Sequence, residues 1–135
     1  MSDNLKTIDI IIPVYNEEEC LTELFKRLLA LRDGAIRDFR VIFVNDGSAD
    51  SSAAMLSNFA DVNSFASVIN FSRNFGHQAA ITAGLDYAAA DYVAVIDADL
   101  QDPPELISEM MKKAEEGYDV VYGKRLARSG ETFFK

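Results

Sequence analysis

Short runs of apolar residues alternate along the chain with longer stretches in which apolar residues recur every three or four positions. The short runs are typical of strands buried on both faces, and the longer stretches are typical of helices that pack one face on a core. This alternation favours an α/β fold in which helices cover both faces of a mostly parallel sheet. The pattern predicts strands at residues 8–14, 40–44, 67–71, 92–96 and 119–122, and helices at 17–31, 51–59, 78–89 and 103–116.

Capping residues mark several of the predicted helix ends. Asn16 is suited to cap the first helix, and Ser48 or Asp50 is suited to cap the second. Asp102 precedes two prolines and a glutamate in the order expected at a helix start, so we expect it to cap the last helix. Gly117 is suited to the position just past the end of that helix, where glycine is common.

Length and composition narrow the class of protein. The 135 residues fit one domain, and 13 basic against 22 acidic side chains give a net charge of −9. This balance argues against nucleic-acid binding, for which a basic face is expected. The single cysteine, Cys20, rules out an intramolecular disulfide framework and fits a reducing compartment. No apolar run reaches the roughly 20 residues of a membrane span, and the polar N-terminus is unlike a signal peptide, so we expect a cytoplasmic location.

Chemistry is expected in the loops after the strands, because ligands of such sheets bind beyond the carboxyl ends of the strands. The loop after the fourth predicted strand holds Asp97, Asp99, Gln101 and Asp102. Carboxylates this close repel one another, and a hard cation such as Mg²⁺ or Mn²⁺ relieves the repulsion. A solvated acidic turn is the alternative interpretation, and Asp102 is better assigned to the helix cap.

Two earlier loops carry side chains suited to a nucleotide. Tyr15 offers a ring that can stack on a base, and Glu17 can accept hydrogen bonds from a base or a ribose. A plain turn followed by a helix cap is the alternative for that loop. Gly47 permits a tight turn after the second predicted strand. Capping does not account for Asp46 beside it, whereas a carboxylate facing the N–H edge of a base would.

Arginines follow two further strands, with Arg73 after the third and Arg125 and Arg128 after the fifth. Guanidinium groups suit phosphate oxygens, and we expect these arginines to gather at the same edge as the acidic loop. The single histidine, His77, has no second histidine with which to form a metal site. We therefore expect His77 to start or pack a helix.

Four motifs occur in order: PVYNE at 13–17, VNDGSAD at 44–50, SRNFGHQ at 72–78 and DADLQDPPE at 97–105. Together they resemble those of family 2 glycosyltransferases, the inverting class with the GT-A fold, over nearly the whole chain. The last two are similar to those of polyprenyl-phosphate glycosyltransferases, such as undecaprenyl-phosphate glucosyltransferases and dolichyl-phosphate mannose synthases. The family usually has Asp where Asn45 stands. Because Asp46 is present, we interpret this difference as tuning of the site and not as its loss.

The resemblance implies a Rossmann-like GT-A sheet and a role for each matching residue. Pro13, Tyr15 and Glu17 would line the pocket for the base and ribose, with Asp46 in contact with the base. Arg73 would lie near the nucleotide or its phosphates.

A second group of residues would act where the sugar is transferred. Asp97 and Asp99 would form the DxD pair at the diphosphate of the nucleotide sugar and its divalent metal, Mg²⁺ or Mn²⁺. Gln101 is a further candidate ligand. Arg125 and Arg128 would meet the diphosphate or the phosphate of the acceptor.

The reaction implied by the resemblance is transfer of a sugar, with inversion, from a nucleoside diphosphate sugar to a polyprenyl phosphate. UDP-glucose is the favoured donor, because residues 72–78 look like the bacterial glucosyl subgroup. GDP-mannose is the second donor considered. The resemblance also implies that more of the catalytic domain follows residue 135. That part would hold much of the acceptor site and would bring the protein to the cytoplasmic face of a membrane.

Three alternatives remain open on the sequence alone. The chain could bind nucleotide without turning over by itself. A phosphorylation-receiver signalling domain has a similar size and acidity, but it needs a carboxylate after the third strand, where Ser72 and Arg73 stand. A nucleotidyltransferase would need a glycine-rich loop with a basic residue after the first strand, where Tyr15, Asn16 and Glu17 stand.

Overall fold

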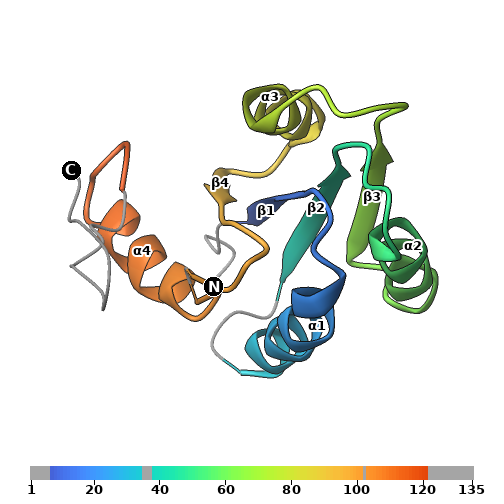
Figure 1. The fold of residues 1–135 in the computed structure, drawn as a ribbon. Helices are drawn as coiled ribbons and strands as arrows, with labels where there is room; N and C mark the ends of the chain where they lie inside the picture. The colour runs from blue at the N-terminus through green and yellow to red at the C-terminus, as the bar shows by residue number, and fades with distance from the viewer. Residues whose placement is uncertain (1–6, 35–37, 102, 122–135) are drawn as a thin grey trace, which may run out of the picture. The chain divides into compact units, whose positions relative to one another are not determined.

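The computed structural model describes residues 7–34, 38–101 and 103–121. The chain divides into two compact units, Met1–Pro104 and Glu105–Lys135. The described part of the first unit holds a sheet and three helices, and that of the second holds α4 (Leu106–Glu115) (Figure 1). Within the described ranges, none of the helices combines the length and the apolar composition that crossing a bilayer requires.

The first unit is built on a four-stranded sheet in the order β3-β2-β1-β4, with every neighbouring pair parallel. The strands are β1 (Ile8–Val14), β2 (Phe39–Asn45), β3 (Ala66–Asn70) and β4 (Tyr92–Val95). The central strands β1 and β2 are buried along almost their whole length, as their apolar sequences predict. The register places Val14 opposite Asn45 and Asn45 opposite Asn70, so the loops that follow these strands begin side by side.

One face of the sheet is covered by α1 (Glu18–Asp33) and α2 (Ser52–Val62), as Figure 1 shows. An aromatic cluster joins these helices to the sheet. The ring of Phe25 on α1 stacks on Phe59 of α2 with 4.2 Å between centroids, and it meets Phe43 of β2 edge-on at 5.8 Å. Aromatic pairs of this kind add to the stabilisation that burial supplies.

The opposite face of the sheet is covered by α3 (His77–Tyr87) (Figure 1). Ala80 of this helix belongs to a buried cluster with Ile11 of β1 and Ile42 of β2. Gly84, one turn further along, lies so close to β1 that a Cβ there would be 2.5 Å from Cγ2 of Ile11. A glycine inside a helix costs about 1 kcal/mol relative to alanine, and this close approach accounts for its presence.

A buried charge lies near the amino end of the sheet. Asp9 in β1 is 1% exposed. Its carboxylate accepts hydrogen bonds from Nε of Arg40 at 3.1 Å and from the amides of Ala89 and Ala90 at 2.9 and 3.1 Å. Burial raises the pKa of Asp9, but these hydrogen bonds outweigh burial and hold the pKa below its ordinary value. The carboxylate thereby ties β2 and the segment before β4 to β1.

The predicted order of strands and helices is confirmed from the first strand to the last helix, and the mostly parallel sheet with helices on both faces is confirmed with it. The ends of the elements shift by a few residues. The last helix begins at Leu106 rather than at residue 103, and its predicted cap, Asp102, lies outside the described residues.

The predicted fifth strand at 119–122 is wrong for residues 119–121, which form no strand. Val120 is 79% exposed, so this short apolar segment has no buried face of the kind that sustains a strand. Tyr122 lies outside the described residues.

Candidate functional site

A pocket of about 430 Å³ lies at the carboxyl ends of the strands in the first unit. It draws on the loops after all four strands, which is where ligands bind in sheets of this kind. The loops predicted to carry the chemistry therefore meet in one place. The pocket is lined by Pro13, Val14, Tyr15, Glu17, Asp46, Asn74, Gly76, His77, Asp97, Ala98 and Asp99.

Asn16 joins the loop after β1 to the loop after β2. Its Oδ1 accepts hydrogen bonds from the backbone amides of Ala49 and Asp50 at 2.8 and 3.3 Å, and the backbone amide of Asn16 donates to Oγ of Ser48 at 3.0 Å. Its φ of 53° lies in the left-handed region, which asparagine tolerates better than most residues. The prediction that Asn16 caps α1 is wrong, because its side chain is directed to the neighbouring loop.

The starts of α1 and α2 are joined by hydrogen bonds from the backbone amides of one segment to the side chains of the other. The amide of Glu17 donates to Oγ of Ser52 at 2.9 Å, and the amide of Glu18 donates to Asp50 Oδ2 at 3.2 Å. In return the amide of Ser51 donates to Oε1 of Glu18 at 2.9 Å. Asp50 also accepts from the first amide of α2 at 2.8 Å, although the N-cap position of that helix is held by Ser51. These reciprocal bonds satisfy amides that a helix start leaves without partners.

Asp46 holds the loop between β3 and α3 against the end of β2. Its side chain is almost fully buried, at 3% exposure. It accepts hydrogen bonds from the amide of Phe75 at 2.7 Å, from Nδ2 of Asn74 at 2.9 Å and from the amide of Gly76 at 3.1 Å. The contacts engage both carboxylate oxygens, so the principal contacts of Asp46 are with this loop.

Gly47, the next residue, makes that close packing possible. It has a φ of +70°, and a Cβ on it would lie 2.3 Å from the carbonyl carbon of Arg73 and 2.4 Å from the amide nitrogen of Asn74. Only glycine meets both requirements without strain. The predicted tight turn after β2 is therefore also a place where two backbones touch.

Three carboxylates line the pocket beside the loop after β4: Glu17, Asp97 and Asp99. Burial raises the pKa of Glu17, and the negative charges of Asp99 and Asp97 raise it further. Burial, with the charge of Glu17 next in importance, also raises the pKa of the nearby Cys20 thiol. A raised pKa keeps the thiol protonated, and a protonated thiol is a poor nucleophile.

The carboxylates beside the loop after β4 fit a hard cation only if a bound ligand supplies part of the metal's coordination. Asp97 and Asp99 both line the pocket, and Mg²⁺ is commonly held by one or two carboxylates together with substrate phosphates. Over the described ranges, no group of three or more His, Cys, Asp or Glu side chains is arranged to hold a metal by itself. Gln101 is not among the lining residues, although its backbone amide donates to Oδ1 of Asp99 at 3.2 Å.

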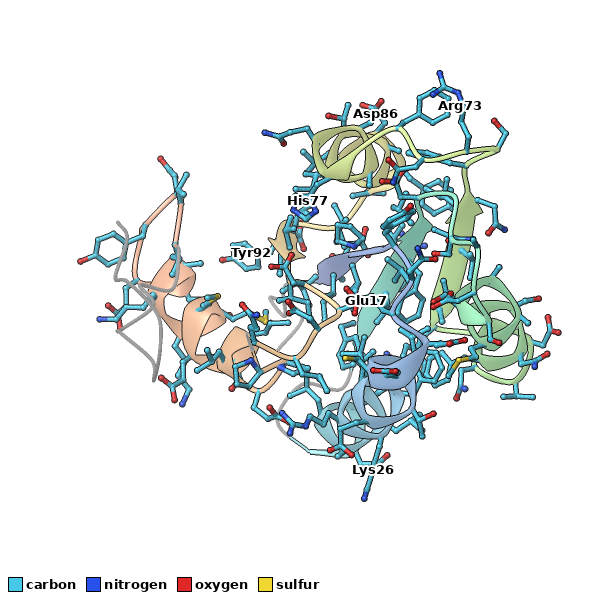
Figure 2. All side chains as sticks on the ribbon, viewed as in Figure 1. Glu17, Lys26, Arg73, His77, Asp86 and Tyr92 are labelled. Atoms are coloured by element: carbon cyan, nitrogen blue, oxygen red, sulfur yellow. The ribbon has the colours of Figure 1, made fainter. Side chains whose placement is uncertain are left out.

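Arg73 is not brought into the pocket. Its guanidinium carbon lies 4.0 Å from the centroid of the Phe75 ring, and Arg73 is absent from the lining. Figure 2 shows it directed away from Glu17 and His77. Arg125 and Arg128, the other predicted phosphate ligands, lie outside the described residues.

His77 begins α3, as predicted, but it also lines the pocket. Its Nε2 lies 3.8 Å from Oδ1 of Asp97. Sequence reasoning missed this position because it considered His77 as a metal ligand, a helix start or a packing residue, and not as a residue that lines the pocket. The informative signal was its place directly after Gly76, in a loop that follows a parallel strand.

Comparisons with known proteins agree with this geometry. Residues 9–135 match the family described as Glycosyl transferase family 2. The chain is 53% identical over 126 residues to the glycosyltransferase YkcC of Bacillus subtilis (strain 168), which covers 93% of this chain and 39% of the relative. It is 42% identical over 129 residues to an undecaprenyl-phosphate 4-deoxy-4-formamido-L-arabinose transferase of Enterobacter sp. (strain 638), covering 95% of this chain and 39% of the relative.

Among solved structures, the fold matches a mannosyltransferase of Pyrobaculum calidifontis in complex with GDP-Man and Mn²⁺. The TM-score is 0.68 at 20% identity, over 82% of this chain and 32% of the other. The sheet and its helices therefore form part of a GT-A fold. The chain spans only 39% of the length of the two curated relatives described above. With a parallel sheet, a pocket formed by its carboxyl-end loops and a family match over residues 9–135, this chain belongs to glycosyl transferase family 2.

Proposed function

We propose that the chain is the nucleotide-sugar-binding part of an enzyme that transfers a sugar, with inversion, to a polyprenyl phosphate. The observation that carries this proposal is the convergence of Tyr15, Glu17, Asp97 and Asp99 on one pocket at the carboxyl ends of the strands. The 42% identity to a transferase that is named for undecaprenyl phosphate supports the choice of acceptor. A lipid acceptor would place the reaction at a membrane surface.

The base and ribose would lie along the loop after β1. Tyr15 is 48% exposed, so its ring is available for stacking. Pro13 and Glu17 line the pocket next to it. Asp46 would form the buried end of this pocket and position the loop that carries Asn74 and the residues after it. UDP-glucose is the donor we favour, and GDP-mannose is the second candidate.

The diphosphate would lie beside the loop after β4. Asp97 and Asp99 would hold a divalent metal, Mg²⁺ or Mn²⁺, together with oxygens of the diphosphate. A bound divalent metal stabilises the negative charge that develops on a leaving diphosphate. The solved mannosyltransferase with the same fold contains Mn²⁺, which supports this choice of cofactor.

The transfer breaks the bond between the anomeric carbon and the oxygen of the diphosphate, and it forms a bond from that carbon to an oxygen of the acceptor phosphate. The diphosphate leaves with the electron pair of the broken bond. The acceptor phosphate is already anionic near neutral pH, so it needs little help from a general base. Positioning of the two reactants and stabilisation of charge then supply most of the rate enhancement.

A second candidate function is nucleotide binding without turnover by the chain alone. It is favoured by the length of the relatives, of which this chain spans 39%. We therefore expect the chain to bind a nucleoside diphosphate sugar weakly and to need the remaining part of the protein for transfer.

The assignment of the metal site is tested by an Asp99→Ala variant in calorimetric titrations with UDP and GDP, each with and without Mg²⁺ or Mn²⁺. We expect the variant to lose the part of the affinity that depends on metal. Asp86→Asn is the matched control, because Asp86 is an exposed carboxylate on α3 and lies outside the pocket. Equal metal dependence in the Asp99→Ala variant and in the unaltered chain would contradict the assignment.

A further inference from the structure

The pocket is strongly acidic for a site that should receive a diphosphate. Its lining contains four carboxylates, and His77 is the one lining side chain among the described residues that can carry positive charge. A diphosphate brought near these carboxylates is repelled unless cations or hydrogen-bond donors compensate for the charge. A metal at Asp97 and Asp99 supplies part of that compensation, and a donor from the protein would supply more.

The backbone just before His77 is fixed at the edge of this acidic group. The backbone amide of Gly76, the residue before His77, donates a hydrogen bond to the buried carboxylate of Asp46 at 3.1 Å. Gly76 has a φ of 110°, a conformation that favours glycine. The backbone that carries the imidazole is therefore positioned by the same carboxylate that fixes the loop after β3.

The imidazole is close to the acidic pair and accessible at the same time. Its Nε2 lies 3.8 Å from Oδ1 of Asp97, which exceeds the length of a hydrogen bond. The side chain is 59% exposed, so a ligand in the pocket can reach it. Figure 2 shows His77 at the start of α3, near β4.

Arg73 is not placed to contact a ligand in the pocket. It is in the same loop, but its guanidinium group lies over the ring of Phe75 and does not line the pocket. Of the two basic side chains between the end of β3 and the first residue of α3, His77 is therefore the one placed to meet a ligand that binds beside Asp97.

We propose that His77 binds the diphosphate of the nucleotide donor by donating a ring N–H to a phosphate oxygen beside Asp97. This inference rests on the proposed function and adds a residue to it. An imidazole has at least one ring N–H in either protonation state, so the contact does not require the side chain to be charged. His77 is then a substrate-binding residue that distinguishes a nucleoside diphosphate from the nucleoside alone.

The test is a titration of the ¹⁵N-labelled chain with UDP and with uridine, followed by NMR in the presence of Mg²⁺. Such titrations measure weak affinities and report in the same spectra whether a variant is folded. We expect His77→Ala to lower the affinity for UDP by about tenfold or more, as for loss of a hydrogen bond to a charged group. The affinity for uridine should change less than about twofold, so the ratio of the two affinities should fall.

Two further variants sharpen the test. His77→Gln keeps an N–H donor and should recover part of the affinity for UDP. Arg73→Ala removes a nearby charge outside the pocket and should leave the affinity ratio within about twofold of that of the unaltered chain. An unchanged ratio in the His77→Ala variant, or an equal loss for UDP and uridine, would overturn the role of His77 alone. If the unaltered chain binds neither UDP nor GDP, the proposed function and this inference are overturned together.

Discussion

The carboxylate of Asp46 accepts a 2.7 Å hydrogen bond from the backbone amide of Phe75, 29 positions further along the chain. The contact joins the end of β2 to the loop that follows β3 and leads into α3. Asn74 adds a second bond to the same carboxylate, at 2.9 Å. Part of the pocket wall is thus built by a buried charge whose partners lie in another loop.

The bond between Asp46 and Asn74 can be tested by exchanging the two side chains. Asp46→Asn should lower the free energy of unfolding by about 1–3 kcal/mol, because an amide group would then face the N–H donors of the loop. Adding Asn74→Asp should recover part of the loss, because the pair again has one donor and one acceptor. Thermal denaturation of the two single variants and the double variant measures this coupling. Losses that simply add in the double variant would contradict a stabilising bond between Asp46 and Asn74.

Asn16 should stabilise the fold through the loop after β2 and not through α1. Asn16→Gly retains a residue that accepts the left-handed φ of 53° but removes the Oδ1 acceptor used by Ala49 and Asp50. We expect a loss of about 1 kcal/mol. Amide hydrogen exchange should speed up at residues 49 and 50, while exchange in the middle of α1 stays nearly constant. Faster exchange confined to the first turn of α1 would instead indicate that Asn16 caps that helix.

The stabilising effect of Asp9 should depend on pH. Its folded pKa lies below the ordinary value, so its hydrogen bonds with Arg40 and the amides of Ala89 and Ala90 stabilise the folded state above the unfolded pKa of about 3.9. That contribution is lost as the pH falls through the folded pKa. At neutral pH, Asp9→Asn should cost about 1–3 kcal/mol.

Urea denaturation of the Asp9→Asn variant and the unaltered chain at several pH values measures this dependence. The difference between the two should narrow below about pH 4, where the Asp9 carboxylate begins to gain a proton in the unfolded chain. Asp86→Asn is again the control, and Figure 2 shows Asp86 on the outer side of α3. A difference that stays constant down to strongly acidic pH would contradict the account of Asp9.

Gly84 should resist replacement by alanine although it lies within a helix. A Cβ at this position would be 2.5 Å from Cγ2 of Ile11, so overpacking should outweigh the gain of about 1 kcal/mol in helix propensity. In the Ile11→Ala background the obstructing atoms are absent, and Gly84→Ala should then become neutral or stabilising. Chemical denaturation of the four chains checks this. The same cost in both backgrounds would show that close packing on Ile11 is not the reason for the glycine.

The chain's pattern of apolar residues predicts the order of the elements well, because each buried strand and each one-sided helix carries its own local signal. The acidic loop and the ring of Tyr15 could also be found, since loops at the carboxyl ends of parallel strands must meet. Tertiary partners could not be found this way. Asn16 carries the same capping signal whether its side chain turns to its own helix or to Ala49. The position of Arg73 after a strand gives no sign that its guanidinium group lies over the ring of Phe75.

Asp9 shows the same limit in a strand. The apolar run at residues 8–14 predicts a buried strand but gives no partner for the charge of Asp9 within it. Arg40 on the next strand and two amides beyond α3 allow this charge to be buried. Those partners lie 31, 80 and 81 positions away, and only the folded sheet brings them together.

The most direct test of the central claim is calorimetric titration of the unaltered chain with UDP and with GDP, each in the presence and absence of Mg²⁺ or Mn²⁺. The account predicts that at least one of the two nucleotides binds, and that the divalent metal increases its affinity. Absence of binding by both nucleotides under every metal condition would contradict the assignment of the pocket.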